Sequence, residues 1–366
     1  MQDHEPKSRA RLLLRPWGLG ILFSALLFAL LYTLYAPQYV TNDDAVILRA
    51  FMGYEGGVPA TFHLYTHTVF AWMLYGLAVL FPGVAWFSIL QIALLFLSSA
   101  VIIKSFAQIA SRSLKTRRGE WAGAATGLVF TAMFALFYTV RITYSFTAVL
   151  CGAAAVAHLF SVDFERSGGV VPRILGGAAL LLCNYFLRQI TVLPPLCFFA
   201  LALVIKLMTG SRTRRVLRPV LIGAVSTALL FGLFAGVRAA DISLTGAGDY
   251  LDWQRARISV LDYTNFAQET SDETLREIGW SNNLKLLAAE WFFLDDRVTA
   301  DAFRAIKAQA EQDTRLPAAE HIASAWRTSA DFFSQNPRIT LAILGALLMA
   351  AAGILAVRRR GRLWAG

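Results

Sequence analysis

Long apolar stretches recur along this chain of 366 residues, and they constrain its fold more than any other feature. Most of them hold roughly 20 residues, the length that an α-helix needs to cross the hydrocarbon core of a bilayer. Lipid offers the backbone no hydrogen-bond partner, so such segments span the membrane as helices. The sequence therefore predicts an all-α polytopic membrane protein with about eight transmembrane helices, at residues 17–36, 84–103, 121–140, 142–161, 174–187, 189–205, 219–237 and 339–357.

Basic residues collect in the short loops between these stretches, and their distribution predicts the orientation of the chain. With eight spans, the clusters at 104–118, 166–173, 206–218 and 358–362 all lie on the same side as the basic N-terminal tail, residues 1–16. Cytoplasmic loops carry an excess of Lys and Arg. We therefore expect both termini in the cytoplasm and a multi-pass protein of the cell membrane.

The first outer loop, residues 37–83, is predicted to be large and structured. Residues 56–103 contain no Asp, Glu, Lys or Arg and are long enough for two spans. A ninth span would, however, move at least one basic cluster to the outer side. We therefore interpret residues 62–81 as a juxtamembrane helix at the interface. The transmembrane core then comprises residues 17–240.

The net charge of +10 is the sum of two opposed regions. Residues 241–336 hold 16 acidic and 9 basic residues, whereas the rest of the chain holds 8 acidic and 25 basic residues. Such a split reflects membrane topology, and the basic clusters are short and separated by spans, so we expect no nucleic-acid partner. Residues 241–337 are predicted to form a small helical extracytoplasmic domain, with Thr270 and Ser281 as helix N-caps. Residues 338–366 then contain the last span and a basic cytoplasmic tail.

Two adjacent aspartates, Asp43 and Asp44, lie in "TNDDAVIL" directly after the first apolar stretch. Together with Glu55 they are the carboxylates expected at the outer side of the transmembrane core. Neighbouring carboxylates repel each other, which raises the pKa of one of them unless a cation or hydrogen bonds compensate. Such a pair suits a general base or a metal site. The pair could also begin a helix, because Asp is favoured in the first helical turn, and both interpretations can hold together.

Single arginines stand at the outer ends of three predicted spans: Arg141, Arg188 and Arg238. Any one of them could reach lipid phosphates from a helix end. Three of them around a loop rich in carboxylates could instead hold a phosphate or diphosphate. Arg188 is the favoured candidate, because it follows a short predicted span in which Asn184 suggests that a polar cavity is near.

His63 and His67 are four residues apart, so they are predicted to share one face of the juxtamembrane helix. With Asp43 or Asp44 they could bind a divalent metal such as Mg²⁺ or Mn²⁺, and His63 completes the candidate set of metal ligands. They could also donate hydrogen bonds to substrate hydroxyls, or anchor the helix at the interface. No carboxylate lies between them, so the pair does not form the zinc-protease motif.

Two weaker signals complete the set of candidate residues. Tyr54 and Glu55 lie in "GYEGGVPA", whose glycines and proline indicate a turn beside the aspartate pair. In the predicted outer domain, the aromatic residues Trp280 and Trp291 could belong to its core or form a sugar-stacking wall. The chain contains no motif for nucleotide binding.

The order of these features resembles the GT-C glycosyltransferases, integral membrane enzymes that use sugars carried on polyprenyl phosphate or diphosphate. An N-terminal span, an Asp pair in the first outer loop, a juxtamembrane helix and spans with outer arginines carry the resemblance over residues 17–240. "TNDDAVILRAFMGYEGGVPATFHLY" and "GWSNNLKLLAAEWFFLDD" also resemble a group of bacterial multi-pass membrane proteins. A departure is "FHLYTH", which stands where many GT-C enzymes have a Lys-Pro pair.

The resemblance implies a function in building the cell envelope. Asp43 would deprotonate the acceptor, Asp44 would be its partner or a metal contact, and Arg188 would hold the lipid phosphate. A sugar would then move from a polyprenyl-phosphate donor to a glycan or lipid acceptor on the outer face of the bacterial inner membrane. Two alternatives from other classes are a transporter or flippase of lipid-linked glycans, and a non-catalytic scaffold that displays the outer domain.

Overall fold

The computed structural model describes residues 16–54, 57–164, 169–209, 213–261, 270–313, 326–327 and 331. The chain divides into two compact units, Met1–Asp241 and Ile242–Gly366. In the first unit the helices are α2 (Pro16–Leu34), α3 (Asn42–Phe51), α4 (Thr68–Leu80), α5 (Trp86–Leu114), α6 (Arg117–Val140), α7 (Tyr144–Ser161), α8 (Val170–Leu187), α9 (Leu193–Thr209) and α10 (Thr213–Thr245), which continues into the second unit. A short 3₁₀ helix, η1 (Gln189–Thr191), precedes α9.

Within the described residues, six helical segments are long and apolar enough to cross a membrane: Pro16–Leu34, Trp86–Leu114, Tyr144–Ser161, Val170–Leu187, Gln189–Met208 and Leu217–Thr245. They confirm the prediction of an all-α multi-pass membrane protein. α6 covers the predicted span 121–140 but is not one of these six, and the predicted span 339–357 lies outside the described residues. Eight spans therefore remain a prediction. The predicted short span 174–187 begins four residues earlier, at Val170, and reaches 18 residues.

A seam of glycines holds α6 close to α5. Gly119, Gly123 and Gly127 recur every four residues, so they lie on one face of α6, and that face packs on α5. A Cβ atom at Gly123 would lie 2.6 Å from the carbonyl oxygen of Phe106, closer than real Cβ contacts allow. Gly20 places α2 equally close to the backbone of α5. Small residues at such spacing let membrane helices approach closely, where packing rather than hydrophobicity drives association.

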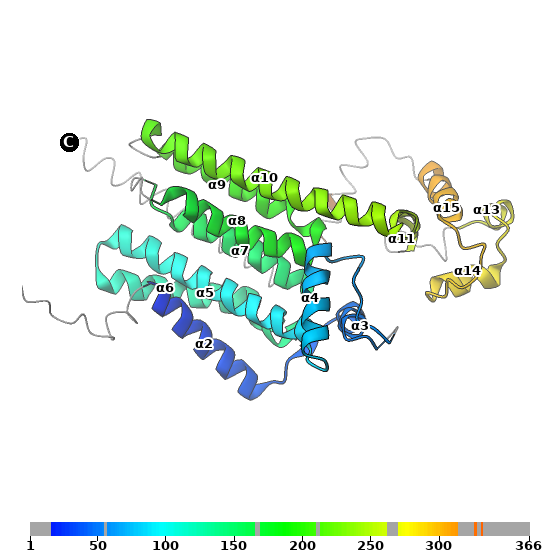
Figure 1. The fold of residues 1–366 in the computed structure, drawn as a ribbon, viewed down its shortest axis with the longest axis horizontal. Coiled ribbons are helices and arrows are strands. Elements are labelled where there is room, and N and C mark those ends of the chain that lie inside the picture. Colours follow the sequence, from blue (N-terminus) through cyan, green and yellow to red (C-terminus); the bar gives the residue numbers. More distant parts are fainter. Residues whose placement is uncertain are drawn as a thin grey trace, which may run out of the picture. The chain divides into compact units, whose positions relative to one another are not determined.

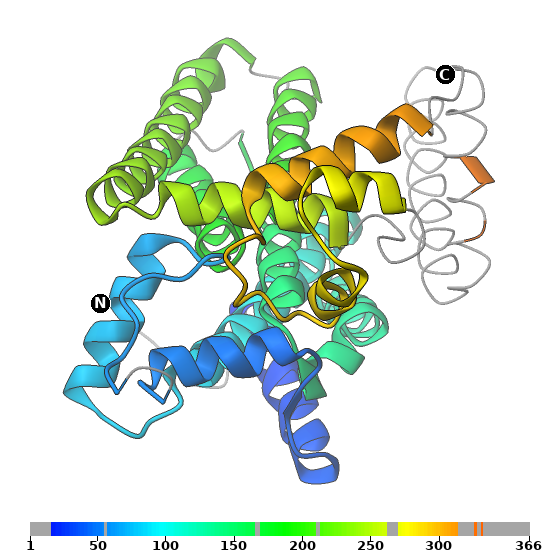
Figure 2. The same cartoon turned by 90° about the vertical axis from the view of Figure 1, so that its right-hand side faces the viewer.

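A short parallel strand pair joins the start of the first loop to the link between α6 and α7. β1 (Gln38–Tyr39) pairs with β2 (Arg141–Ile142), and the amide of Val40 donates a hydrogen bond to the carbonyl of Ile142 at 3.1 Å. The pair fixes where the chain leaves α2 and where it enters α7. Beyond it, α3 and α4 follow, and α4 crosses the direction of α5 at a steep angle (Figures 1 and 2).

The predicted juxtamembrane helix is shorter than expected. It begins at Thr68 rather than at residue 62, and His67 is its N-cap, whose Nδ1 accepts a hydrogen bond from the amide of Val69 at 3.1 Å. The prediction that His63 and His67 share a helical face is therefore wrong. The helix begins there because the imidazole of His67 accepts a hydrogen bond from one of the first amides, and these amides lack partners within the helix.

The second unit contains short helices among its described residues: α11 (Gly248–Leu261), α13 (Asp272–Glu277), α14 (Asn282–Ala289) and α15 (Ala300–Asp313). Trp280 and Phe303 are buried in its core, with ring centroids 5.7 Å apart. Ser281 caps α14 as predicted, but Ser271 rather than Thr270 caps α13. Trp291 is exposed, its φ is +66°, and its ring stacks on the guanidinium of Arg257 at 4.3 Å. The helical character of the described part of this region is confirmed, whereas its extracytoplasmic location stays a prediction.

The glycine seam generates a test of the fold. We expect Gly123→Ala to lower the thermal unfolding temperature of the detergent-solubilised protein, since overpacking costs about 1–3 kcal/mol. Gly232 in α10 is the matched control, because nothing lies within 4 Å of a Cβ built there. Gly232→Ala should leave stability unchanged or raise it, as Ala is the better helix former. Equal unfolding temperatures for the two variants would contradict the close approach of α5 and α6.

Candidate functional site

The two adjacent aspartates occupy the first turn of α3 but differ in their surroundings. The side chain of Asp44 is fully buried, whereas Asp43 is exposed. Thr41, the residue before the helix, donates from its Oγ1 to Oδ2 of Asp44 at 2.8 Å. The helix-start interpretation of this pair is therefore confirmed, and the fold separates the two carboxylates into a buried one and an accessible one.

Asp44 anchors α3 to the beginning of α7. Its Oδ1 accepts a hydrogen bond from the amide of Tyr144, the first residue of α7, at 2.8 Å. That amide has no partner within its own helix, and the positive end of the helix dipole favours a carboxylate there. Burial raises the pKa of Asp44, and hydrogen bonds from Tyr144 and Thr41 partly offset this effect. Because both oxygens are engaged, Asp44 is placed as a structural anchor rather than as the predicted metal contact.

Asp43 is available for chemistry. Among the described residues its carboxylate makes no hydrogen bond or ion pair, and it interacts electrostatically with Tyr144. Because Asp44 fixes the same helical turn, the backbone of Asp43 is held at a defined place beside the start of α7. An exposed carboxylate on a rigid helical turn can accept a proton from a bound hydroxyl group.

Arg188 joins this group from the end of α8. One of its terminal nitrogens donates to Oγ of Ser145, and its guanidinium carbon lies 5.2 Å from the centre of the Tyr144 ring. Two buried polar atoms here have no hydrogen-bond partner among the described residues: Nε of Arg188 and the hydroxyl of Tyr144. Buried polar groups are normally satisfied. Asp43, Tyr144, Ser145 and Arg188 are therefore the residues of our candidate site.

Sequence reasoning missed Tyr144 and Ser145. A tyrosine at the end of an apolar stretch is typical of the membrane interface, so it carries no functional signal of its own. Its importance comes from its electrostatic interaction with both Asp43 and Arg188, which are 145 residues apart in the chain.

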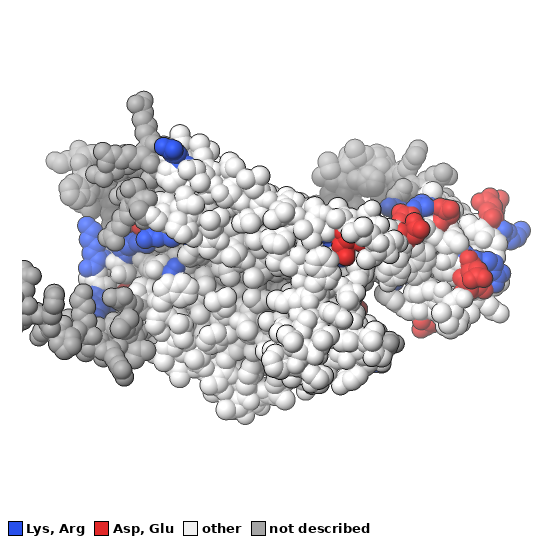
Figure 3. Space-filling model, viewed as in Figure 1, with Lys and Arg blue, Asp and Glu red and all other residues white. Residues whose placement is uncertain are grey.

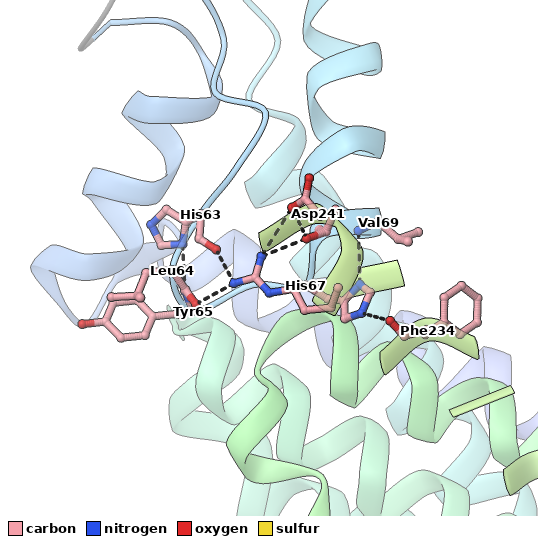
Figure 4. A network of polar contacts seen from close by, with 9 residues as sticks. His63, Leu64, Tyr65, His67, Val69, Phe234 and Asp241 are labelled. Carbon is pink, nitrogen blue, oxygen red and sulfur yellow. Dashed lines mark hydrogen bonds and ion pairs between the residues drawn. The ribbon is translucent and has the colours of Figure 1, made fainter. Parts of the chain in front are cut away.

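Arg238, predicted as a phosphate contact, is fully engaged inside the protein. It is buried in α10 and donates to Oγ1 of Thr68 at 2.9 Å and to the carbonyls of His63 and Leu64 at 3.4 Å each (Figure 4). Asp241, three residues further on, lies 4.0 Å from the guanidinium and accepts a hydrogen bond from Thr68 at 2.6 Å. Arg238 therefore clamps the first loop to α10.

The two histidines also serve the first loop. Nδ1 of His67 accepts from the amide of Val69, so its Nε2 carries the proton and donates to the carbonyl of Phe234 at 2.9 Å (Figure 4). Nδ1 of His63 accepts from the amide of Tyr65 at 3.3 Å. His67 thus uses both ring nitrogens to bind backbone groups, whereas His63 uses its Nδ1.

The predicted metal site does not form in the described part of the chain. No group of three or more His, Cys, Asp or Glu side chains lies close enough together there to hold a metal ion. Asp44 is engaged with Tyr144, and His63 with Tyr65. The alternative of a metal held by Asp43, Asp44 and His63 is therefore not supported.

Of the remaining predicted site residues, one is buried in the bundle, two are exposed and one lies outside the described residues. Asn184 is buried and donates to the carbonyl of Ala148 at 2.6 Å, so it joins α8 to α7 instead of facing a polar cavity. Arg141 is exposed in β2, and Tyr54 is exposed after α3. Glu55 lies outside the described residues.

An apolar cavity of about 670 Å³ lies among α5, α6, α7 and α9. Two of its lining residues, Ile190 and Thr191, follow Arg188 almost directly in the chain, so the cavity reaches the segment beside the candidate site. Its other lining residues are Ile102, Phe106, Phe130, Val149, Gly152, Ala153, Val156, Ala157, Phe160, Pro194, Pro195 and Phe198. The lining suits a hydrocarbon chain, because it offers almost no polar group.

Comparisons with known proteins do not assign a family to this chain. No family model matches it, and no curated protein or solved structure matches it either. The resemblance to GT-C glycosyltransferases therefore rests on the residues named above, and the function has to be argued from the geometry of the site.

The anchor role of Asp44 can be tested by substitution. We expect Asp44→Ala to reduce the free energy of unfolding by about 1–3 kcal/mol, since it leaves the buried amide of Tyr144 without an acceptor. Asp44→Asn keeps an acceptor oxygen and should cost less. Asp43→Ala is the matched control and should leave stability unchanged, as its side chain is exposed. The measurement is thermal or denaturant unfolding in detergent, and equal losses for Asp43→Ala and Asp44→Ala would refute the assignment.

The first loop should also make stability depend on pH. Burial, and then the charge of Arg238, lower the pKa of His63 to about 4, and the pKa of His67 is lowered as well. Below pH 6.5 the unfolded chain binds protons that the folded loop does not accept, so stability should be complete above this pH and decline from pH 6.5 towards pH 4.

The matching variant is His63→Gln. It is compared with the wild type by the slope of the unfolding free energy against pH, not by the absolute value of that free energy. We expect a shallower decline of the unfolding free energy, by up to about 1.4 kcal/mol per pH unit for one proton. Unfolding measured at pH 8 provides the reference for any loss of packing. Parallel pH profiles would show that His63 titrates normally in the folded protein.

Proposed function

We propose that this protein is a GT-C-like glycosyltransferase, which moves a sugar from a polyprenyl-phosphate donor to a cell-envelope glycan or lipid acceptor on the outer face of the membrane. The observation that carries the proposal is that Tyr144 has the guanidinium of Arg188 beside its ring and interacts electrostatically with the accessible Asp43, while an apolar cavity reaches the segment after Arg188. Base, phosphate contact and chain-binding surface are the three parts that such a reaction requires.

Asp43 supplies the base. It removes a proton from an acceptor hydroxyl, whose oxygen then bonds to the anomeric carbon of the sugar. The bond from that carbon to the phosphate oxygen breaks, and its electron pair leaves with the lipid phosphate. A positioned base contributes about 10²–10⁴-fold to such a rate. The rigid first turn of α3, held through Asp44, keeps this carboxylate in place.

Arg188 stabilises the leaving phosphate. Its Nε has no protein acceptor among the described residues, and the hydroxyl of Tyr144, whose ring centre lies 5.2 Å from the guanidinium carbon, has no partner there either. Arginine matches phosphate oxygens with parallel hydrogen bonds, and donors placed where charge develops stabilise the transition state. Ser145 orients the guanidinium from the other side through its hydrogen bond.

The apolar cavity holds the polyprenyl chain. Its volume of about 670 Å³ lies within the usual range of ligand sites, and it reaches the segment that follows Arg188. A chain bound there places its phosphate near the guanidinium. The donor arrives through the bilayer, so no nucleotide site is needed.

Asp43 is the one accessible carboxylate among the described residues of the candidate site, and this favours inversion at the anomeric carbon. A retaining reaction proceeds through a second carboxylate that attacks the sugar. The neighbouring Asp44 is buried, and both of its oxygens accept hydrogen bonds. Direct displacement by the acceptor, assisted by Asp43, is therefore the mechanism that we propose.

Complementation of a strain that lacks the protein tests this function. We expect Asp43→Asn and Arg188→Gln to lower transfer at least 100-fold while leaving expression and unfolding temperature near those of the wild type. Asp249→Asn is the matched control, because Asp249 is also an exposed aspartate in the first turn of a helix, α11. Mass spectrometry of the surface glycans measures the product. Full restoration by Asp43→Asn would rule out Asp43 as the base.

The same strains separate a transferase from a flippase. Loss of a transferase leaves the sugar-loaded lipid at the outer leaflet, where an impermeant glycosidase or lectin can reach it. Loss of a flippase leaves that lipid at the inner leaflet, where neither reagent reaches it until the membrane is opened. We expect the first result for Asp43→Asn, and the second would favour transport.

A further inference from the structure

A second, polar cavity lies at the other end of α7 from Asp43 and Arg188. Its volume is about 400 Å³, and it is lined by side chains from α2, α5, α7 and α8. Three of them are cationic: Lys104 and Arg112 of α5 and Arg173 of α8. Lys and Arg gather on the surface at this end of the first unit (left in Figure 3). The sequence presented Lys104 as part of a basic loop, but it lies inside an apolar helix.

Lys104 is a buried cation whose neighbours do not neutralise it. Its side chain is 3% exposed, and its Nζ donates to Nδ1 of His158 at 3.1 Å and to Oγ of Ser161 at 3.3 Å. Nε2 of His158 lies 3.0 Å from the carbonyl oxygen of Arg173, which can only accept, so this nitrogen carries the ring proton. His158 is therefore neutral. Since an ammonium has three N–H groups, one of them has no acceptor among the described residues.

Cationic side chains outnumber acidic ones in the described lining of the cavity. Three cations face it, and Asp163 is the one acidic side chain among its described lining residues. The Nη1 of Arg173 donates to the backbone carbonyl of Asp163 at 3.4 Å rather than to its carboxylate. A buried ammonium such as that of Lys104, which has no carboxylate partner among the described residues, is costly, and such residues mark binding sites or pathways.

We propose that this cavity binds a phosphate group, with Lys104 at its base and Arg112 and Arg173 at its sides. Arg and Lys together supply the charge and the N–H donors that phosphate oxygens accept. Trp17 forms the wall opposite the ammonium, 5.0 Å from Nζ to its ring centre, and provides an apolar surface for the rest of the ligand. The phosphate belongs to a phospholipid headgroup or to a soluble phosphate ester. The site does not depend on the proposed glycosyl transfer.

The test uses the purified full-length chain in detergent, stripped of lipid. Inorganic phosphate is titrated by calorimetry, and phosphatidylglycerol is added in native mass spectrometry with phosphatidylcholine, a zwitterion of no net charge, as the comparison. Lys104→Met and Arg173→Gln are the variants. Arg118→Gln is the matched control, since Arg118 is an exposed arginine at the start of α6 that does not line the cavity.

We expect Lys104→Met and Arg173→Gln each to weaken binding at least tenfold, and Arg118→Gln to bind as the wild type does. Binding of inorganic phosphate would identify a soluble ligand, and binding of phosphatidylglycerol alone would identify a lipid headgroup. The proposal is overturned if the wild type binds neither probe, or if both variants bind like Arg118→Gln.

Folding provides an independent readout. Lys104→Met removes a buried charge, so without ligand it should be at least as stable as the wild type, and it should lose the rise in unfolding temperature that the bound probe gives. If Lys104→Met does not fold, Arg173→Gln decides the question, because Arg173 is partly exposed. An unchanged rise in Arg173→Gln would then count against the site.

Discussion

The hydrogen bond between the carboxylate of Asp44 and the amide of Tyr144 is the contact on which the candidate site depends. It links α3, which carries the aspartate pair, to α7, whose first residues contact Arg188. The β1–β2 pair also joins these two helices, since β1 lies just before α3 and β2 just before α7. Asp44 thus has a structural role, and this role gives Asp43 a fixed position. The adjacency of the two residues in the sequence is the direct cause of this division.

The helices of the membrane core were predictable because the length of an apolar run is a local property of the sequence. A run of apolar residues identifies a span without reference to the rest of the chain, and the segments later found as α2, α5, α7, α9 and α10 could all be located in this way. Boundaries were less secure. α8 begins before the predicted span because Arg173, a charge that ended the apolar run, lies inside the helix and faces a polar cavity. The start of α4 was misplaced because the side chain of His67 acts as a cap.

The roles of individual charges were much harder to predict, since they depend on contacts distant in sequence. Arg188 and Arg238 both stand near the end of an apolar run, yet one retains an unpaired nitrogen and the other is bound on several sides. One local signal did separate them. Asp241 lies three residues after Arg238, where a helix brings both side chains to one face, whereas no carboxylate follows Arg188 at that spacing. An arginine with a helical acid partner is more readily structural.

The lining of the apolar cavity has a consequence for selectivity. Thr191 is the one residue with a polar side chain among the described lining residues, so the cavity cannot recognise a chain by hydrogen bonds. Apolar contacts distinguish ligands by volume, and one methylene changes affinity only about 10–200-fold at most. A bilayer presents many hydrocarbon chains of similar bulk, and the protein meets them continually by lateral diffusion in two dimensions. If the cavity holds the lipid donor that we propose, discrimination among lipids must reside in the polar headgroup, and the hydrocarbon tail supplies residence time rather than identity.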